Sequence, residues 1–177
     1  MNRYATLHNI VLEIQPEHVV EIGTWNGDRA ADFMGTSNCY YTGFDLFEEA
    51  SQETDEKEYN VKKHFEVAEV AQALQRKGFT KYMLVRGDTN ETLANTTVEP
   101  FDFCFIDGGH SEDTIKNDFD WVYENIQPGG TIILDDYYTP KQAGLGCNFL
   151  IEEYELEILE PTDRTAICGV SLAKVVK

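Results

Sequence analysis

The chain alternates short apolar runs with segments whose apolar residues recur at helical spacing. The apolar runs predict strands at 19–22, 40–46, 82–85, 101–106 and 131–134. The helical spacing predicts helices over 7–14, over 30–34 with an end at Gly35, over 67–74, over 111–126 and over 141–153. Such an alternation indicates a mainly parallel sheet that is covered by helices on both faces.

The last two apolar runs differ from the others, because only a turn at 161–164 separates a predicted strand at 156–159 from another at 166–172. No crossover helix fits in this gap, so the two strands must pair antiparallel. We therefore predict an α/β fold with a Rossmann-like, doubly wound sheet, mostly parallel, of seven strands with a C-terminal antiparallel hairpin. The length of 177 residues suits one domain, and we predict a single domain over 1–177.

One segment, residues 47–60, is acidic and lacks apolar periodicity. It follows the second strand, where it could lie near a ligand. Long connections of this composition are more often solvated, mobile loops than substrate lids. We favour the loop and keep the lid as the alternative.

The composition narrows the range of partners and compartments. The formal net charge of -18 disfavours nucleic acid and anionic membranes, and it suits small neutral or cationic ligands. The alternative is that the excess of acid serves only to keep the protein soluble. No apolar run approaches the length of a membrane span, and the N-terminus does not read as a signal peptide. The four cysteines are irregularly spaced without a CxxC pair, so we expect a reduced, cytoplasmic compartment.

Candidate ligand-binding residues follow the predicted strands, because ligands of open parallel sheets bind beyond the carboxyl ends of the strands. The stretch 21–27 contains small residues that allow close approach of a ligand to the backbone. Asp45 lies 22 positions beyond Gly23, close to the spacing at which an acid accepts the hydroxyls of a ribose. After the third strand, Asp88 and Thr89 could meet an adenine edge, although Asp88 could equally cap a helix.

Acidic residues gather after the fourth and fifth strands. Asp107 and His110 follow the fourth, and Asp135 and Asp136 follow the fifth. Three carboxylates and a histidine on adjacent loops form a candidate oxygen-rich metal site, and a solvated acidic rim is the alternative. His110 is a candidate general base or metal ligand, or else a helix-entry residue bonded to the backbone.

Together these motifs resemble the class I S-adenosylmethionine-dependent methyltransferases, in the compact branch whose first motif reads Glu-Ile-Gly-Thr-x-x-Gly, here Glu21 to Gly27. Further matching stretches are Asp45, 86–89, 101–110 and 127–136. The resemblance implies S-adenosylmethionine as cofactor, in a site formed by Glu21, Gly23, Thr24, Trp25, Gly27, Asp45, Leu46, Asp88, Thr89 and Asp107.

The resemblance also implies the chemistry of the acidic loops. Asp107, Asp135 and Asp136 match ligands of Mg²⁺ or another divalent cation in metal-dependent small-molecule and sugar O-methyltransferases, with His110 and Asp107 as catalytic residues. The catechol enzymes usually carry Asp-Ala-Asp-Lys at 107–110, so a catechol acceptor is not expected. Trp25 stands where many class I enzymes have a glycine.

The chain lacks the longer N-terminal segment with which larger relatives cover their substrate. We expect either an open acceptor groove or a homo-oligomer in which a second subunit completes the pocket. The expected function is methyl transfer from S-adenosylmethionine to a small-molecule acceptor, by O-methylation with metal assistance.

Two other classes of function remain open. An NAD-dependent oxidoreductase would also use Gly23 and Asp45, but the full G-x-G-x-x-G pattern is absent. A noncatalytic cofactor-binding module could have the same fold.

Overall fold

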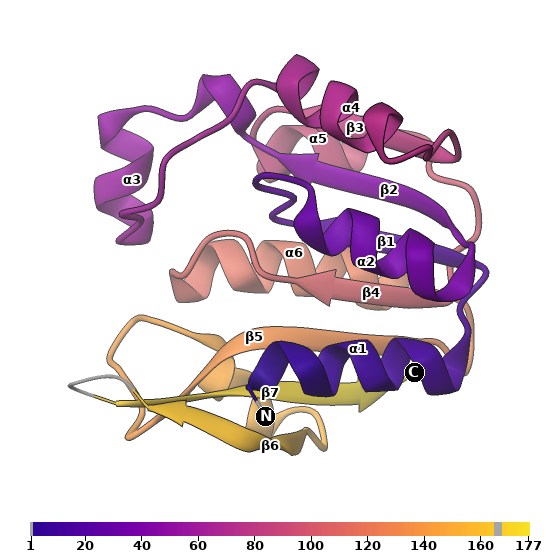
Figure 1. The fold of residues 1–177 in the computed structure, drawn as a ribbon. Coiled ribbons are helices and arrows are strands. Elements are labelled where there is room, and N and C mark those ends of the chain that lie inside the picture. The colour runs from indigo at the N-terminus through magenta and orange to yellow at the C-terminus, as the bar shows by residue number, and fades with distance from the viewer. Residues whose placement is uncertain (1, 165–167) are drawn as a thin grey trace.

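The computed structural model describes residues 2–164 and 168–177, and in this part of the chain it forms one seven-stranded sheet (Figure 1). The strands are β1 (His18–Ile22), β2 (Tyr40–Asp45), β3 (Tyr82–Arg86), β4 (Phe103–Ile106), β5 (Thr131–Thr139), β6 (Glu157–Arg164) and β7 (Gly169–Val176). Their order is β3-β2-β1-β4-β5-β7-β6; β1 to β5 pair in parallel, and β7 pairs antiparallel with β5 and β6. The predicted fold class is confirmed.

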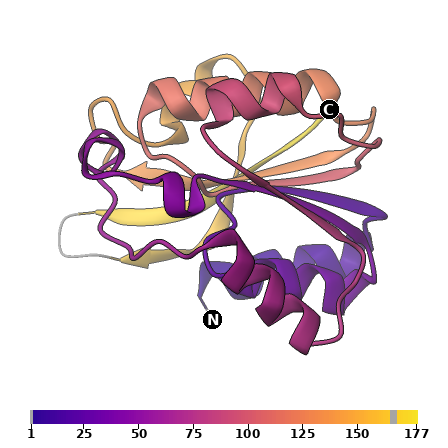
Figure 2. The same ribbon diagram turned by 90° about the horizontal axis from the view of Figure 1, so that it is seen from above.

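Helices cover both faces of this sheet (Figure 2). One face carries α1 (Arg3–Ile14), α2 (Asp28–Ser37) and α4 (Val67–Arg76), and the other carries α5 (Thr89–Asn95), α6 (Glu112–Asn125) and the 3-10 helix η2 (Cys147–Glu152). The side chains of β4 alternate between the two layers. Phe103 and Phe105 pack with Phe33 on the first face, and Cys104 and Ile106 pack into the cluster of the second face. The core is therefore two apolar layers, one on each side of the sheet.

Helix capping moves two helix ends away from their predicted positions. The first helix begins at Arg3, before the predicted range, because the side chain of Asn2 accepts a hydrogen bond from the Ala5 amide. The second continues through Gly35 and ends where Asn38 adopts the left-handed conformation, with φ of 54°. Asparagine tolerates this conformation better than most residues, so the sequence contained this signal.

The prediction of an irregular loop over 47–60 is wrong. The segment forms the 3-10 helix η1 (Phe47–Glu49) and the helix α3 (Gln52–Glu58), which Figure 1 shows beyond the end of the sheet. Phe47 is buried in the core, and Ser51 and Thr54 form a capping box at the start of α3. Capping and one buried ring, rather than apolar periodicity, order this segment.

Two further sequence predictions need correction. The segment 141–153 holds η2 instead of an α-helix, because Gly144 and Gly146 take positive φ before it. The predicted turn at 161–164 is strand, since β6 continues to Arg164, which pairs with Gly169 after a register shift. The prediction that 166–172 is a strand extends over 166–167, which lie outside the described residues. The helix α5 had been anticipated only through a possible cap at Asp88, whose side chain accepts from the Asn90 amide.

The order of the strands fixes where a ligand crevice can form. The chain turns from β1 outward to β2 and β3, and then returns to place β4 on the other side of β1. In the register, Ile22 is level with both Phe44 and Ile106, so the carboxyl ends of β1, β2 and β4 lie together. Such a switch point is where open α/β sheets bind their ligands. In the described part of the chain, no helix has the length and apolar character required to cross a membrane.

Candidate active site

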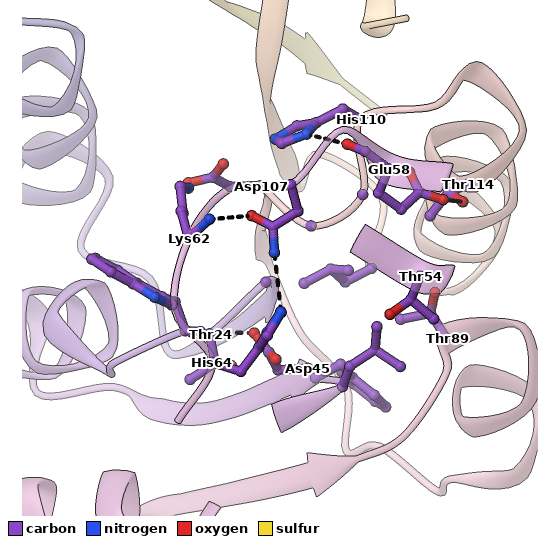
Figure 3. A pocket seen from close by; sticks show the side chains of 18 of the residues that line it. Thr24, Asp45, Thr54, Glu58, Lys62, His64, Thr89, Asp107, His110 and Thr114 are labelled. Carbon is purple, nitrogen blue, oxygen red and sulfur yellow. Dashed lines mark hydrogen bonds between the residues drawn. The ribbon is translucent and has the colours of Figure 1, made fainter. Parts of the chain in front are cut away.

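A cavity of about 420 Å³ lies beyond the carboxyl ends of β1 to β4 (Figure 3). This volume is typical of a site for a small molecule or cofactor. The residues of the predicted cofactor site that line it are Gly23, Thr24, Trp25, Asp45, Leu46, Asp88, Thr89 and Asp107. The structure thus brings together residues from four separate strand ends.

The loop after β1 packs closely against the backbone that follows β4, where Gly23 lies beside Asp107. The amide of Gly23 donates to the carbonyl of Phe44 at 2.8 Å, and its φ is 97°, in the region that favours glycine. A Cβ at position 23 would overlap the backbone carbonyl of Asp107. Gly23 therefore lets the backbone reach the floor of the cavity.

Asp45 closes one side of the cavity and keeps part of its accepting capacity free. Its Oδ2 accepts from the Trp25 amide at 2.8 Å and its Oδ1 from the Phe47 amide at 2.7 Å. Each carboxylate oxygen has two lone pairs, so both can accept one further bond from a ligand. Burial raises the pKa of Asp45, and the two amide bonds oppose this shift.

Two residues of the predicted cofactor site do not line the cavity. Glu21 is fully buried; one of its oxygens accepts a short hydrogen bond from Tyr41, whose hydroxyl is also 3.1 Å from that of Thr24. Burial raises the pKa of Glu21 well above its ordinary value. Gly27 caps α2 in the left-handed conformation. Both positions support the loop that carries Thr24, which does line the cavity.

The three acids of the predicted metal site are placed differently from one another. Asp107 lines the cavity, and its pKa is raised well above the ordinary value by burial and by the nearby Asp135. Asp135 and Asp136 are buried and do not line it. Asp135 instead forms an ion pair with Arg3, whose Nε is 2.9 Å from Oδ1.

Among the described residues, no three histidine, cysteine, aspartate or glutamate side chains are grouped as ligands for a metal ion. The arrangement does not support the predicted metal site, because the guanidinium of Arg3 and the hydroxyl of Tyr4 contact Asp135. Sequence reasoning missed both residues, since the predicted first helix began after them.

His110 lies in the wall of the cavity, on the loop after β4. Its Nδ1 is 2.6 Å from the carbonyl oxygen of Glu58, which can only accept, so Nδ1 carries the proton in this contact (Figure 3). Its Nε2 is 3.5 Å from Oδ2 of Asp136. Asp136 has an unusual positive φ of 62° and accepts from the Tyr138 hydroxyl at 3.0 Å. Burial and Asp135 raise the pKa of Asp136, whereas His110 lowers it.

The helix α3 contributes to the lining of this cavity and is hydrogen-bonded to the start of α6. The carboxylate of Glu58 accepts from the amide of Ser111 at 2.9 Å and from the hydroxyl of Thr114 at 2.6 Å (Figure 3). The indole of Trp25 donates to the carbonyl of Lys63 at 2.8 Å. The segment that sequence reasoning favoured as a solvated loop is therefore a wall of the site.

Asp118 is a buried acid that was not anticipated from the sequence. Asp118 of α6 lines the cavity near Thr89, is 1% exposed, and has one oxygen without a hydrogen-bond partner. Burial raises the pKa of Asp118 to about 7. The helical spacing placed apolar neighbours of Asp118 on the sheet side of α6. No motif in the sequence marked Asp118 itself as a residue of the site.

We expect the effect of Asp118→Asn on the free energy of unfolding to be more favourable at about pH 8 than at about pH 5, by roughly 3 kcal/mol. The pKa of Asp118 is higher in the folded than in the unfolded chain, so its contribution is present at low pH and is lost as the pH rises through about 7. Urea unfolding of both proteins at the two pH values measures this difference. Asp120→Asn, at a half-exposed acid of the same helix that pairs with Lys116, is the matched control; equal effects of the two substitutions would contradict the assignment.

Comparison with known proteins identifies relatives of this fold. Residues 20–137 match a family described as a methyltransferase domain. An uncharacterized protein of Acanthamoeba polyphaga mimivirus is 29% identical over 119 residues, which are 67% of this chain and 50% of that protein. The chain thus spans about half the length of this curated relative.

Two solved structures are similar in fold. An rRNA methylase from Streptococcus thermophilus has a TM-score of 0.69 at 15% identity and covers 100% of this chain and 97% of its own. The O-methyltransferase TomG from Streptomyces achromogenes, involved in tomaymycin synthesis and solved in complex with S-adenosylmethionine, has a TM-score of 0.69 at 14% identity, over 97% of this chain and 78% of its own. At these identities the similarity establishes the fold.

Proposed function

The chain belongs to this family of methyltransferase domains, and we propose that it transfers the methyl group of S-adenosylmethionine to a hydroxyl group of a small-molecule acceptor. We further propose that residues 1–177 act as a single domain. The observation that carries the proposal is the cavity at the switch point of the sheet, where Gly23 gives access to the backbone and Asp45 keeps two accepting positions free.

We propose the following positions for the parts of the cofactor in the cavity. Asp45 would accept both ribose hydroxyls, and Asp88 and Thr89 would border the adenine. The loop of Gly23 and the carboxyl group of Asp107 would hold the methionine end. Glu21 and Gly27 do not line the cavity, and we propose that they hold this loop in place without contacting the cofactor.

When bound, S-adenosylmethionine would supply the methyl group: its carbon–sulfur bond would break as the acceptor oxygen bonds to the methyl carbon, and the electron pair of the broken bond would stay on sulfur. The acceptor hydroxyl must also lose its proton. His110 would take it on Nε2, because Nδ1 is held by the carbonyl of Glu58. The carboxylate of Asp136, 3.5 Å from Nε2, would stabilise the imidazolium that forms.

A small acceptor is favoured over a nucleic acid by the formal net charge of -18. Oxygen is proposed as the methylated atom by analogy with TomG, an O-methyltransferase of similar fold that acts in tomaymycin synthesis. The rRNA methylase among the neighbours shares the fold, and a fold does not determine the substrate.

Calorimetric titration with S-adenosylmethionine and with NAD, followed by transfer of radiolabelled methyl groups to a panel of alcohols, phenols and sugars, tests this proposal. We expect binding of S-adenosylmethionine alone and a labelled, base-stable ether product. Binding of NAD would support an oxidoreductase. Cofactor binding without product from any acceptor would indicate a noncatalytic module.

We expect Asp45→Asn to weaken S-adenosylmethionine binding by about 10- to 100-fold, because a charged acceptor of ribose hydroxyls contributes about 1.5–3 kcal/mol. The asparagine side chain keeps one accepting oxygen. Its NH₂ group replaces the second oxygen and cannot accept a hydrogen bond from a ribose hydroxyl. Calorimetry gives the dissociation constant, and a thermal melt checks the fold. Asp120→Asn, at a half-exposed acid outside the cavity, is the control for the loss of one charge; an unchanged affinity in Asp45→Asn would remove Asp45 from the site.

A further inference from the structure

We propose that Arg3 and Tyr4, in the first turn of α1, take the place of a divalent cation at Asp135, so that methyl transfer by this chain requires no divalent metal. The inference rests on the proposed function for the reaction itself. Its structural part, a metal-binding capacity that Arg3 suppresses, can be tested without turnover.

The four lone-pair positions of the Asp135 carboxylate are all used. Oδ1 accepts from Nε of Arg3 at 2.9 Å and from the amide of Asp136 at 2.8 Å. Oδ2 accepts from Nη2 of Arg3 at 3.0 Å and from the hydroxyl of Tyr4 at 2.9 Å. An ionised carboxylate offers about four such positions, and the side chain of Asp135 is only 1% exposed. A metal ion could reach this group only by displacing the guanidinium.

Arg3 is held firmly in this position from two sides. Its Nη1 donates to the carboxylate of Asp163 on β6 at 3.0 Å. Its guanidinium carbon lies 4.7 Å from the centre of the Tyr4 ring, and that of Arg29 lies 4.9 Å from the same centre. The planar guanidinium suits paired contact with a carboxylate and stays charged at every pH of interest.

Tyr4 connects this ion pair to the cavity. It lines the cavity, and its hydroxyl is also 3.4 Å from Oδ2 of Asp107. Tyr4 therefore occupies the space between the two acids that an ion bridging them would need.

A guanidinium in the place of a divalent metal ion changes how an acceptor hydroxyl can be activated. A guanidinium supplies positive charge and N–H donors, but it has no open coordination position for the hydroxyl oxygen. In the proposed mechanism, His110 would then take the acceptor proton without help from a metal ion, with Asp136 beside it.

The test uses the full chain as wild type, Arg3→Met, and Asp163→Asn as a matched control that removes a partner of Arg3 but leaves Asp135 covered. Manganese binding is measured by the loss of the electron paramagnetic resonance signal of free Mn²⁺. We expect the Arg3→Met protein to bind Mn²⁺ at least about tenfold more tightly than wild type and the control. Circular dichroism establishes that each variant is folded, and Arg3→Gln replaces Arg3→Met if the latter does not fold.

Tight Mn²⁺ binding by the wild-type protein, or no gain in a folded Arg3 variant, would overturn the proposal. Turnover in the presence of a chelator is the second measurement, and we expect no loss. A loss would overturn the proposal as well. Absence of turnover under all conditions would instead count against the proposed function, because Mn²⁺ binding is measured independently of it.

Discussion

Replacing His110 with asparagine is expected to lower kcat for methyl transfer by about 10²- to 10⁴-fold, the range that a general base contributes. The amide of asparagine can still donate to the carbonyl of Glu58, as Nδ1 of His110 does now. It offers no basic nitrogen at the position of Nε2, so the substitution removes the base and keeps the anchor. Steady-state kinetics with the acceptor found by the screen gives kcat.

The same experiment separates a chemical role of His110 from a structural one. Calorimetric affinity for S-adenosylmethionine should change by less than about threefold, because the loss is expected in the chemical step and not in cofactor binding. His8→Asn, a change of the same type at a half-exposed histidine paired with Asp32, is the matched control and should leave kcat unchanged. Equal kcat values for His110→Asn and wild type would show that proton transfer uses another group.

The sheet could be predicted from the sequence because each of its strands is a local signal. A run such as Phe103–Ile106 is apolar at every position, since both of its faces are buried. The closing hairpin followed from chain length alone, because no crossover helix fits between its strands. Turn and helix boundaries were predicted less accurately. The residues assigned to a turn at 161–164 belong to β6, which continues to Arg164 after a register shift beyond Leu159.

The candidate site was predictable to the extent that it lies at strand ends. Gly23 and Asp107 follow β1 and β4, and Asp45 is the last residue of β2. The ends of these three parallel strands are level, so topology alone brings the three residues together. Arg3 could not be found in this way, because its contact with Asp135 joins residues 132 positions apart through the packing of a helix. Asp118 was missed for a similar reason, since only the position of α6 beside the cavity gives this acid a role.

Replacing Gly23 with alanine is expected to lower the free energy of unfolding by more than about 4 kcal/mol and to abolish cofactor binding. Two costs combine at this position. A φ of 97° strains any residue with a side chain, typically by about 1–3 kcal/mol. The new Cβ would also overlap the carbonyl of Asp107, which belongs to the backbone and cannot move away without disturbing the end of β4.

Gly78→Ala separates these two costs. Gly78 has a similar φ of 89°, but a Cβ built there has no atom within 4 Å. This control should therefore show only the strain, about 1–3 kcal/mol, and leave the affinity for S-adenosylmethionine unchanged. Urea unfolding and calorimetry of both variants provide the comparison. If Gly23→Ala cost no more than Gly78→Ala, the close approach of the β1 loop to Asp107 would not be a constraint on the fold, and the position of the cofactor loop would have to rest on Asp45 and its two amide bonds instead.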